Sequence, residues 1–334
     1  MTATLGAAAR SPVVPALMKA AAIDRFGPPS VITLHTLPVP ELDAHEVLIA
    51  VHTAGVGSWD AKIRDGTWAT GNEHFPLVLG SDGAGVVAAK GSRVRRLRVG
   101  ERVWAYEYEN PKGGFYAQYV AIDAGGVAPL PPQLDLLHAG AATTTGLTAQ
   151  QGIDDILRLR GGEQPLIFGA TGGVGTLAVQ FAARTGARVV ASARTRAGAR
   201  LLRELGADAV FDPQRDDTRQ SLRAIGGDSF DAILALAGGD ALEQCIDLVR
   251  TGGRVAYPNG VEPEPRRRRN VRVVAYDASA GPREFARLSR AVEDAHLRVP
   301  VAARYPLAGA ARAHERLQEG HVIGRIALQV RRAG

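Results

Sequence analysis

Hydrophobic residues follow two different patterns along the chain, and the change comes near residue 138. Before that point the apolar runs are short and are broken by Gly, Pro and Asp, as in HEVLIAVHTAGVG and ERVWAYEY. Short apolar runs between turn residues are typical of strands in a mostly-β domain. We therefore expect residues 18–137 to form such a domain.

Regular alternation replaces this pattern in residues 138–299. Helix-length amphipathic segments separate strand-like segments, which read PLIFGA, ARVVASA, DAVFD, FDAILALA and GRVAYPNG. Strands that alternate with helices predict a parallel sheet built from right-handed crossovers. The chain then ends on a helix in PLAGAARAHERLQEG and a strand in GRIALQV. The expected fold class is α/β, with a doubly wound parallel sheet and a second, mostly-β domain.

Length and composition support two domains and exclude several classes of protein. The chain has 334 residues, of which 46% are hydrophobic. No apolar run approaches the roughly 20 residues of a membrane span, and the N-terminus has no signal-peptide pattern. We predict a cytoplasmic protein in which residues 1–17 form a disordered extension. The single cysteine, Cys245, excludes an intrachain disulfide, and its helical setting predicts an inert buried thiol.

The net charge of +6 raises the question of nucleic-acid binding. Nearly all of the 40 basic residues are Arg, and they are scattered through every segment. The densest run, residues 266–269, lies in a Pro-rich loop just after Glu262 and Glu264. Charge runs are usually solvated surface, so we favour that interpretation over a nucleic-acid contact.

A cluster of small residues joins the first strand of the second domain to its helix. The segment PLIFGATGGVG runs into TLAVQFAARTG, and a helix start at this point presents unpaired N–H groups to an anion. Gly172 allows a close approach of a dinucleotide pyrophosphate, and Gly175 lets the helix meet the sheet. The usual first glycine is replaced by Ala170, and the alternative is a glycine turn that only packs the helix. The predicted cofactor-binding residues here are Ala170, Thr171, Gly172, Gly173, Val174 and Gly175.

The end of the second strand discriminates between nicotinamide cofactors. An NAD enzyme places a carboxylate there for the ribose, whereas an NADP enzyme offers small residues and a cation. The sequence reads Ser192, Ala193, Arg194, with Arg200 close by and no acid, so NADPH is favoured over NADH. The nicotinamide half should meet the ends of later strands, at Leu236, Ala237, Tyr257, Asn259 and Gly260.

The chain from Met18 onward resembles the medium-chain dehydrogenase/reductase superfamily, and within it the quinone oxidoreductase (zeta-crystallin-like) branch. The resemblance is carried by MKAAAIDRFGPP, AGVGSWDAKIRDG, PLVLGSDGAGVVAAKGS, GGFYAQYVAI, IFGATGGVGTLAVQFAARTGARVVA and LRELGADAVFD. It implies a GroES-like catalytic domain of residues 18–137 and 300–334, a Rossmann NADP-binding domain of residues 138–299, and a cleft between them. It also implies a homo-oligomer, with a dimer expected.

Zinc alcohol dehydrogenases share the fold that this resemblance implies, so a metal must be considered. Their catalytic zinc needs a Cys in the first β section and a His-Glu pair after a later strand. Here Gly57 and Ser58 stand at the first position, and Ser81 and Asp82 stand at the second. The four-Cys lobe of a structural zinc is missing from the sequence as well. We therefore expect no metal site and a zinc-independent reaction.

Without a Lewis acid, reduction of an activated acceptor is favoured over oxidation of an alcohol. A quinone or α,β-unsaturated carbonyl accepts hydride from a nicotinamide stacked on it in a dry cleft. The expected function is NADPH-dependent reduction of such acceptors, and the alternatives are an enoyl-thioester reductase or a non-catalytic NADPH-binding sensor. The candidate catalytic residues in GSWDAKIR are Ser58, Asp60, Lys62 and Arg64.

Aromatic residues supply the candidate walls of the acceptor pocket. Trp59 and Trp68 are the predicted substrate contacts. A second group of rings flanks the loop EYENPKGG, which either roofs the cleft or belongs to the core; it consists of Trp104, Tyr106, Tyr108, Phe115 and Tyr116. For Asp60 the alternative to a catalytic role is an acid at a helix N-terminus, where the helix dipole favours it.

Overall fold

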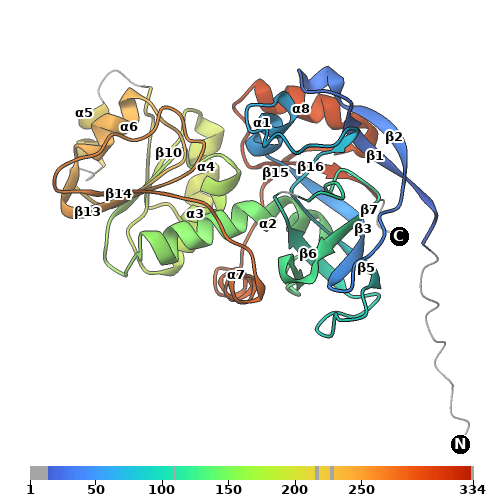
Figure 1. Cartoon of the computed structure of the whole chain (residues 1–334). Helices are drawn as coiled ribbons and strands as arrows, with labels where there is room; N and C mark the ends of the chain where they lie inside the picture. The colour runs from blue at the N-terminus through green and yellow to red at the C-terminus, as the bar shows by residue number, and fades with distance from the viewer. Residues whose placement is uncertain (1–13, 109, 215–217, 226–228, 332–334) are drawn as a thin grey trace, which may run out of the picture.

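A computed structural model describes residues 14–108, 110–214, 218–225 and 229–331 of the chain. Most of the predicted disordered extension, residues 1–13, lies outside this range. Residue 17 already belongs to the first strand, β1 (Leu17–Ile23). The described chain forms two lobes that lie side by side, with the parallel sheet in one and the antiparallel strands in the other (Figure 1).

The first lobe is built on a six-stranded sheet whose paired neighbours are all parallel. Its strand order is β11 (Ala209–Phe211), β10 (Val190–Ser192), β9 (Pro165–Phe168), β12 (Phe230–Ala235), β13 (Val249–Pro258) and β14 (Arg272–Tyr276). The earliest strand, β9, lies in the middle, so the strand order reverses beside it, as in a doubly wound dinucleotide-binding sheet. The predicted α/β fold class is confirmed.

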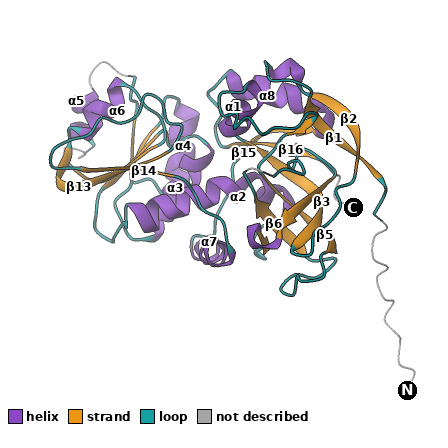
Figure 2. Cartoon of the chain, in the orientation of Figure 1, coloured by secondary structure: helices purple, strands orange, loops and turns teal. Residues whose placement is uncertain are grey.

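Helices connect the strands of this sheet and pack beside it (Figure 2). They are α3 (Gly173–Arg184), α4 (Arg196–Glu204), α5 (Thr218–Ala224) and α6 (Asp240–Ile246). A further helix, α7 (Pro282–Asp294), follows β14 and packs on α2 (Leu136–Gln151) and β8 (Val127–Pro129). Apolar side chains alternate with polar ones at helical spacing in α7, which buries Phe285, Leu288 and Val292. Cys245 is buried on α6 as predicted, and burial raises the pKa of its thiol to about 12.

The second lobe holds the strands predicted from the short apolar runs. Its larger sheet has the order β15 (Val301–Pro306), β16 (Arg325–Gln329), β3 (Glu46–Val56), β5 (Asp82–Lys90), β6 (Arg102–Tyr106) and β8 (Val127–Pro129), with β7 (Tyr119–Asp123) paired to β3. A smaller sheet has the order β2 (Thr33–Pro38), β1 and β4 (Leu77–Val78). Neighbouring strands of this lobe pair antiparallel, except that β15 pairs parallel with β16. The end of the chain thus returns, through β15 and β16, to the lobe that the N-terminal half of the chain forms.

Helices also occur in this lobe. The first is α1 (Ser58–Asp65), which lies inside the segment whose pattern predicted strands, and the second is α8 (Ala310–Gln318). Short 3-10 turns complete the lobe at η1 (Pro29–Val31), η2 (Ala124–Gly126) and η4 (Leu307–Gly309). The segment forms a helix rather than a strand because glycines bound it on both sides: Gly57 precedes α1, and Gly66 ends it with a left-handed φ of 86°.

One long helix, α2 (Leu136–Gln151), joins the two lobes. It packs on β3, β5 and β6 of one lobe and on α3 and α7 of the other. Small residues make this possible: a Cβ on Gly140 would lie 2.5 Å from the carbonyl oxygen of Thr53, so only glycine fits there. A π-helical turn, η3 (Gly152–Ile156), continues it. Of the described helices, none is long and apolar enough to cross a membrane.

Candidate cofactor and substrate cleft

A cleft of about 910 Å³ lies between the two lobes. Residues from both domains line it, as expected where the carboxyl ends of parallel strands face a second domain. The Rossmann side contributes Gly169, Gly172, Gly173, Val174, Gly175, Leu236, Ala237, Gly238, Asn259 and Gly260. The opposite side contributes Gly57, Ser58, Trp59, Lys62, Trp68, Tyr106, Tyr108 and Arg325.

The glycine-rich turn forms one end of this cleft. Gly169 follows β9 with a φ of 78°, a left-handed conformation that favours glycine. A Cβ on Gly175 would lie 2.5 Å from the Cα of Ala170, so α3 packs directly on the turn. At Gly172 the nearest atom to such a Cβ is 3.7 Å away, which leaves open space in front of the helix start. Backbone N–H groups of α3 therefore face the cleft uncovered.

The remaining residues predicted in this turn support it from behind. Ala170 is buried, and the carbonyl oxygen of Thr171 accepts a hydrogen bond of 2.8 Å from the N–H of Gly324. Gly324 directly precedes β16, so the turn is tied to the catalytic lobe. Neither Ala170 nor Thr171 lines the cleft.

The end of β10 lies beside the glycine turn. The Ser192 hydroxyl accepts a hydrogen bond of 2.8 Å from the N–H of Gly169, so this buried side chain braces the turn. Ala193 is also buried, whereas Arg194 and Arg200 are exposed. Among the described residues, neither arginine has an ion-pair partner at salt-bridge distance. Ser192, Ala193, Arg194 and Arg200 are not among the residues that line the cleft, and the two arginines are exposed beyond the end of β10.

The ends of the later strands complete the Rossmann side of the cleft. Leu236, Ala237, Asn259 and Gly260 line it as predicted, and the Asn259 amide donates a hydrogen bond of 2.6 Å to Asp277. Tyr257 does not line it: the ring is buried in the core, and its hydroxyl donates to Glu264 at 3.3 Å. The phenol points away because alternate residues of β13 face opposite sides of the sheet.

Aromatic rings make the wall opposite the glycine turn. Trp59, Trp68, Tyr106 and Tyr108 line the cleft, and Trp68 meets Tyr108 edge-on with ring centroids 6.2 Å apart. The other aromatic residues of that segment, Trp104, Phe115 and Tyr116, are fully buried. Strand β6 explains the difference between Trp104 and Tyr106 in part, because Tyr106 is its last residue and projects beyond the core.

Lys62 connects this wall to the Rossmann side. Its ammonium donates to Glu262 at 2.7 Å and lies 4.9 Å from the centre of the Trp68 ring. Gly260 faces the same ring, since a Cβ there would lie 2.8 Å from Trp68. The two domains therefore meet across the cleft at Trp68.

We expect Gly260→Ala to displace the Trp68 ring and to raise the KM for a flat acceptor roughly fivefold, because ring stacking contributes about 1 kcal/mol. The φ of Gly260 is 88°, so backbone strain will also cost about 1 kcal/mol of stability. Gly162→Ala is the matched control, because its φ is 80° and no atom lies within 4 Å of its Cβ position. An equal rise of KM in both variants would show that strain, not the Trp68 contact, is responsible.

Asp60 and Arg64 were predicted as catalytic residues, but neither lines the cleft, so neither side chain contacts a substrate there directly. Both are buried, at 0% and 1% exposure. Asp60 accepts hydrogen bonds from the N–H of Gly57 at 2.8 Å and from the Ser81 hydroxyl at 3.1 Å. Burial, followed by repulsion from Asp82, raises the pKa of Asp60 to about 7. Both side chains point inward from α1 because they occupy the helix face that packs on the domain core.

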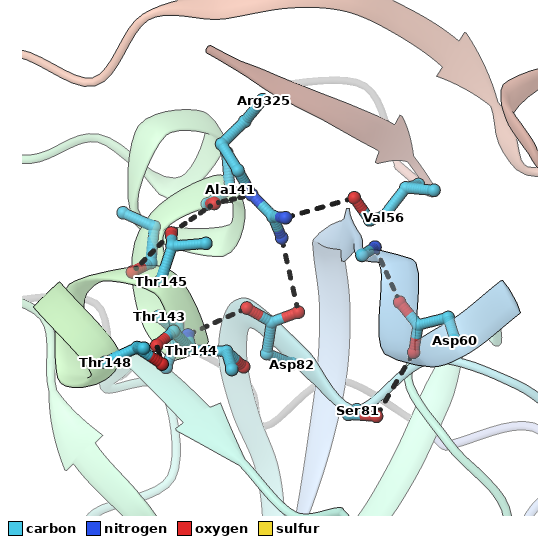
Figure 3. Close-up of polar contacts among 12 residues, drawn as sticks. Val56, Asp60, Ser81, Asp82, Ala141, Thr143, Thr144, Thr145, Thr148 and Arg325 are labelled. Carbon is cyan, nitrogen blue, oxygen red and sulfur yellow. Dashed lines mark hydrogen bonds and ion pairs between the residues drawn. The ribbon is translucent and has the colours of Figure 1, made fainter. Parts of the chain in front are cut away.

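Arg325 is the functional candidate that the sequence did not reveal. It reaches from β16 into the cleft floor with 5% exposure (Figure 3). Its Nε donates to the carbonyl oxygen of Ala141 at 2.6 Å and its Nη1 to that of Val56 at 3.1 Å. The second Nη lies 3.8 Å from Asp82, which also accepts the N–H of Thr144 at 2.9 Å. The available signal was a charge at the start of the apolar strand GRIALQV.

Comparison with known proteins assigns both domains. Residues 43–132 match the alcohol dehydrogenase GroES-like domain, and residues 205–328 match a family described as zinc-binding dehydrogenase. Within the described residues, no group of three or more His, Cys, Asp or Glu side chains is placed to hold a metal ion. This is consistent with the zinc-free branch of the superfamily.

Individual relatives cover nearly the whole chain. The quinone oxidoreductase of Lama guanicoe is 31% identical over 90% of this chain and 94% of its own. The solved quinone oxidoreductase of Coxiella burnetii has a TM-score of 0.85 at 30% identity, over 94% of this chain and 100% of its own. An NAD-dependent alcohol dehydrogenase scores 0.86 at 30% identity, with the same coverage of 94% and 100%. A mycobacterial protein solved with NADPH scores 0.81 at 26% identity, again over 94% and 100%.

These matches join the doubly wound sheet, the GroES-like lobe and the cleft between them into one assignment. The predicted resemblance is confirmed, and the protein is an oxidoreductase. The chain belongs to the medium-chain dehydrogenase/reductase superfamily, and its relatives there include quinone oxidoreductases.

Proposed function

We propose that this protein is an NADPH-dependent, zinc-independent reductase that transfers hydride to quinones or activated α,β-unsaturated carbonyls. The observation that carries the proposal is the composition of the cleft. One side is a glycine cradle at a helix start, and the other is a wall of aromatic rings. Such a cleft suits a dinucleotide lying against a flat, electrophilic acceptor.

The cofactor side of the cleft fits a dinucleotide phosphate. Gly172 leaves space in front of the α3 N–H groups for the pyrophosphate, and a side chain there would fill that space, whereas Gly173 makes room for the Arg325 side chain. Arg194 and Arg200 are exposed beside the carboxylate-free end of β10, where the 2′-phosphate would lie. The mycobacterial structure in complex with NADPH supports this cofactor class. When bound, NADPH supplies the hydride.

The chain's own residues then position the acceptor and exclude water from it. Trp59, Trp68 and Tyr108 provide flat apolar surface for a ring or enone, and Lys62 holds Trp68 in place through its contact with that ring. Thr144 and Thr148 line the same space, but the Thr148 hydroxyl already donates to the carbonyl oxygen of Thr144 at 2.9 Å and the Thr144 hydroxyl oxygen is buried. Ser58 also lines the cleft, at the start of α1.

Turnover tests this proposal directly. The purified protein would be mixed with NADPH or NADH and a panel of acceptors: a benzoquinone, an ortho-quinone, cyclohexenone and a crotonyl thioester, with an alcohol and NADP⁺ as the reverse reaction. We expect NADPH-selective reduction of quinones or the enone. Preference for the thioester would identify an enoyl-thioester reductase, and tight NADPH binding without any turnover would support the sensor alternative. The predicted dimer and cytoplasmic location remain separate predictions.

Cofactor selectivity gives a second test, at the end of β10. Ala193→Asp places a carboxylate where the 2′-phosphate is expected, and like charges at this distance cost several kcal/mol, so the KM for NADPH should rise at least roughly 100-fold. The KM for NADH should stay or fall, because the carboxylate can accept the ribose hydroxyl. Ala193→Asn is the neutral control of equal size. An equal loss of both cofactors in both variants would place the adenosine end elsewhere.

A further inference from the structure

A second cavity of about 300 Å³ adjoins the cleft at the aromatic wall. Trp68 and Tyr108 line both spaces, so the two meet at these rings. The cavity wall also includes Ser81, Leu79 and Ile63. An acceptor that extends from the cleft past Trp68 into this cavity would meet Ser81 there, with its other end toward the cofactor cradle.

Ser81 is hydrogen-bonded to a carboxyl group that is fully covered by protein. Asp60 contacts the walls of both spaces: its Oδ2 accepts the N–H of Gly57, which lines the cleft, and its Oδ1 lies 3.1 Å from the hydroxyl of Ser81, which lines the cavity. Figure 3 shows the contact between Asp60 and Ser81. We propose that Ser81 donates a proton to the reduced acceptor and that Asp60 then restores the proton on Ser81; this proposal rests on the proposed function.

A directional chain of donors determines which Asp60 oxygen carries a proton. Arg64 only donates, so its Nη1 bond of 3.1 Å makes the His314 Nδ1 an acceptor. Burial and the adjacent Arg64 lower the pKa of His314 to about 3, and the neutral ring therefore has its hydrogen on Nε2. That hydrogen points to the Tyr116 hydroxyl at 3.1 Å, which in turn donates to Asp60 Oδ2 at 3.4 Å. Oδ2 thus has two donors, and the proton belongs on Oδ1, facing Ser81.

The charges around Asp60 keep that proton in place near neutral pH. Burial and the neighbouring carboxylate of Asp82 raise its pKa to about 7, against the lowering effects of the Gly57 N–H, Arg325 and Ser81. A protonated Asp60 donates to the Ser81 oxygen and leaves the Ser81 hydrogen free for the acceptor. An ionised Asp60 instead accepts that hydrogen, and Ser81 can no longer donate. The pair therefore works as a donor below about pH 7 and loses this function above it.

The proton and electron balance closes without a further reactant. Two electrons and one hydrogen arrive as hydride from NADPH, and negative charge develops on the acceptor oxygen. The Ser81 O–H bond breaks as an O–H bond forms on that oxygen, while the Asp60 O–H bond breaks and restores the Ser81 hydroxyl. After product leaves, water entering the cavity returns a proton to Asp60 through Ser81. Positioned proton transfer of this kind contributes roughly 100-fold or more to rate.

The test compares Ser81→Ala with Ser81→Thr, which retains a hydroxyl. With saturating NADPH and cyclohexenone, the wild-type kcat should be level at low pH and fall about tenfold per pH unit above pH 7. Ser81→Ala should lower kcat roughly 100-fold and remove that fall, whereas Ser81→Thr should keep it. Asp60→Asn should also give a level profile. NADPH affinity, measured by fluorescence titration, should stay within twofold in the two Ser81 variants.

Other outcomes distinguish failure of this proton relay from failure of the proposed reductase function. Glu107 lines the same cavity and burial raises its pKa to about 7 as well, so a fall that disappears in Glu107→Gln but persists in Ser81→Ala would assign the titration to Glu107. A Ser81→Ala enzyme with wild-type kcat and pH profile would overturn the relay while hydride transfer stands. If Asp60→Asn does not fold, the two Ser81 variants still decide. A wild-type protein that reduces none of the acceptors with NADPH would overturn both.

Discussion

Replacing Arg325 with methionine should destabilise the protein by about 3–5 kcal/mol, the usual cost of removing one partner from a buried ion pair. Arg325 is 5% exposed and Asp82 is fully buried, with 3.8 Å between their charged groups. The variant leaves the Asp82 carboxylate without its cation and the carbonyl oxygens of Ala141 and Val56 without their donors. Because β3, β16 and α2 meet at this guanidinium, the loss should appear as a lower midpoint of chemical unfolding.

A double-mutant cycle separates the ion pair from the other contacts of Arg325. Asp82→Asn alone removes the charge but retains an acceptor for the Thr144 N–H, and the double variant should lose less stability than the sum of the single ones. Arg325→Lys is the conservative comparison, since it keeps the charge but cannot make the forked contacts to Ala141 and Val56. A loss below about 1 kcal/mol in Arg325→Met would show that the pair contributes nothing net, as exposed pairs do.

Local sequence signals predicted the parts of this site that one segment builds alone. The glycine turn needs only a strand, a helix and small residues in sequence, so the order of residues alone was enough to place Gly172 and Gly175 where the strand leads into the helix. The missing carboxylate after β10 was visible in the same way at Ala193. Both inferences depend on backbone geometry that recurs wherever a parallel strand leads into a helix.

The rest of the site depends on pairings between distant segments, which periodicity does not encode. Asp60 looks the same in sequence whether it faces substrate or the Gly57 N–H, and its neighbour Ser81 comes from another element. Arg325 pairs with Asp82 across more than half of the chain, and only the return of β16 to the first domain brings them together. The helix α1 did not show in the apolar pattern for a related reason, because eight residues between glycines carry too few apolar positions to show a helical period. Its sequence signal was Asp60, for which an acid at a helix N-terminus was the alternative and which lies in the first turn of α1.

A substitution in the glycine turn should change cofactor affinity without changing the stability of the fold. Gly172→Ala should leave stability within about 0.5 kcal/mol of wild type, because its φ of −74° suits any residue and no atom lies closer than 3.7 Å to the new Cβ. NADPH affinity should nevertheless fall roughly 100-fold, since the methyl group holds the pyrophosphate off the α3 N–H groups and charged hydrogen bonds worth about 3 kcal/mol are lost. Fluorescence titration with NADPH measures the second effect and thermal unfolding the first.

Gly175→Ala is the matched variant in the first turn of α3, where the helix packs against the glycine turn. Its Cβ would lie 2.5 Å from the Ala170 Cα and 2.6 Å from the carbonyl carbon and oxygen of Ala170. Backbone atoms cannot move aside as a flexible side chain can, so α3 must shift from the turn, and overpacking of this kind costs about 1–3 kcal/mol. We therefore expect Gly175→Ala to lose both stability and NADPH affinity. If Gly172→Ala bound NADPH as tightly as wild type, the cradle would be a packing turn and the pyrophosphate would have to lie elsewhere in the cleft.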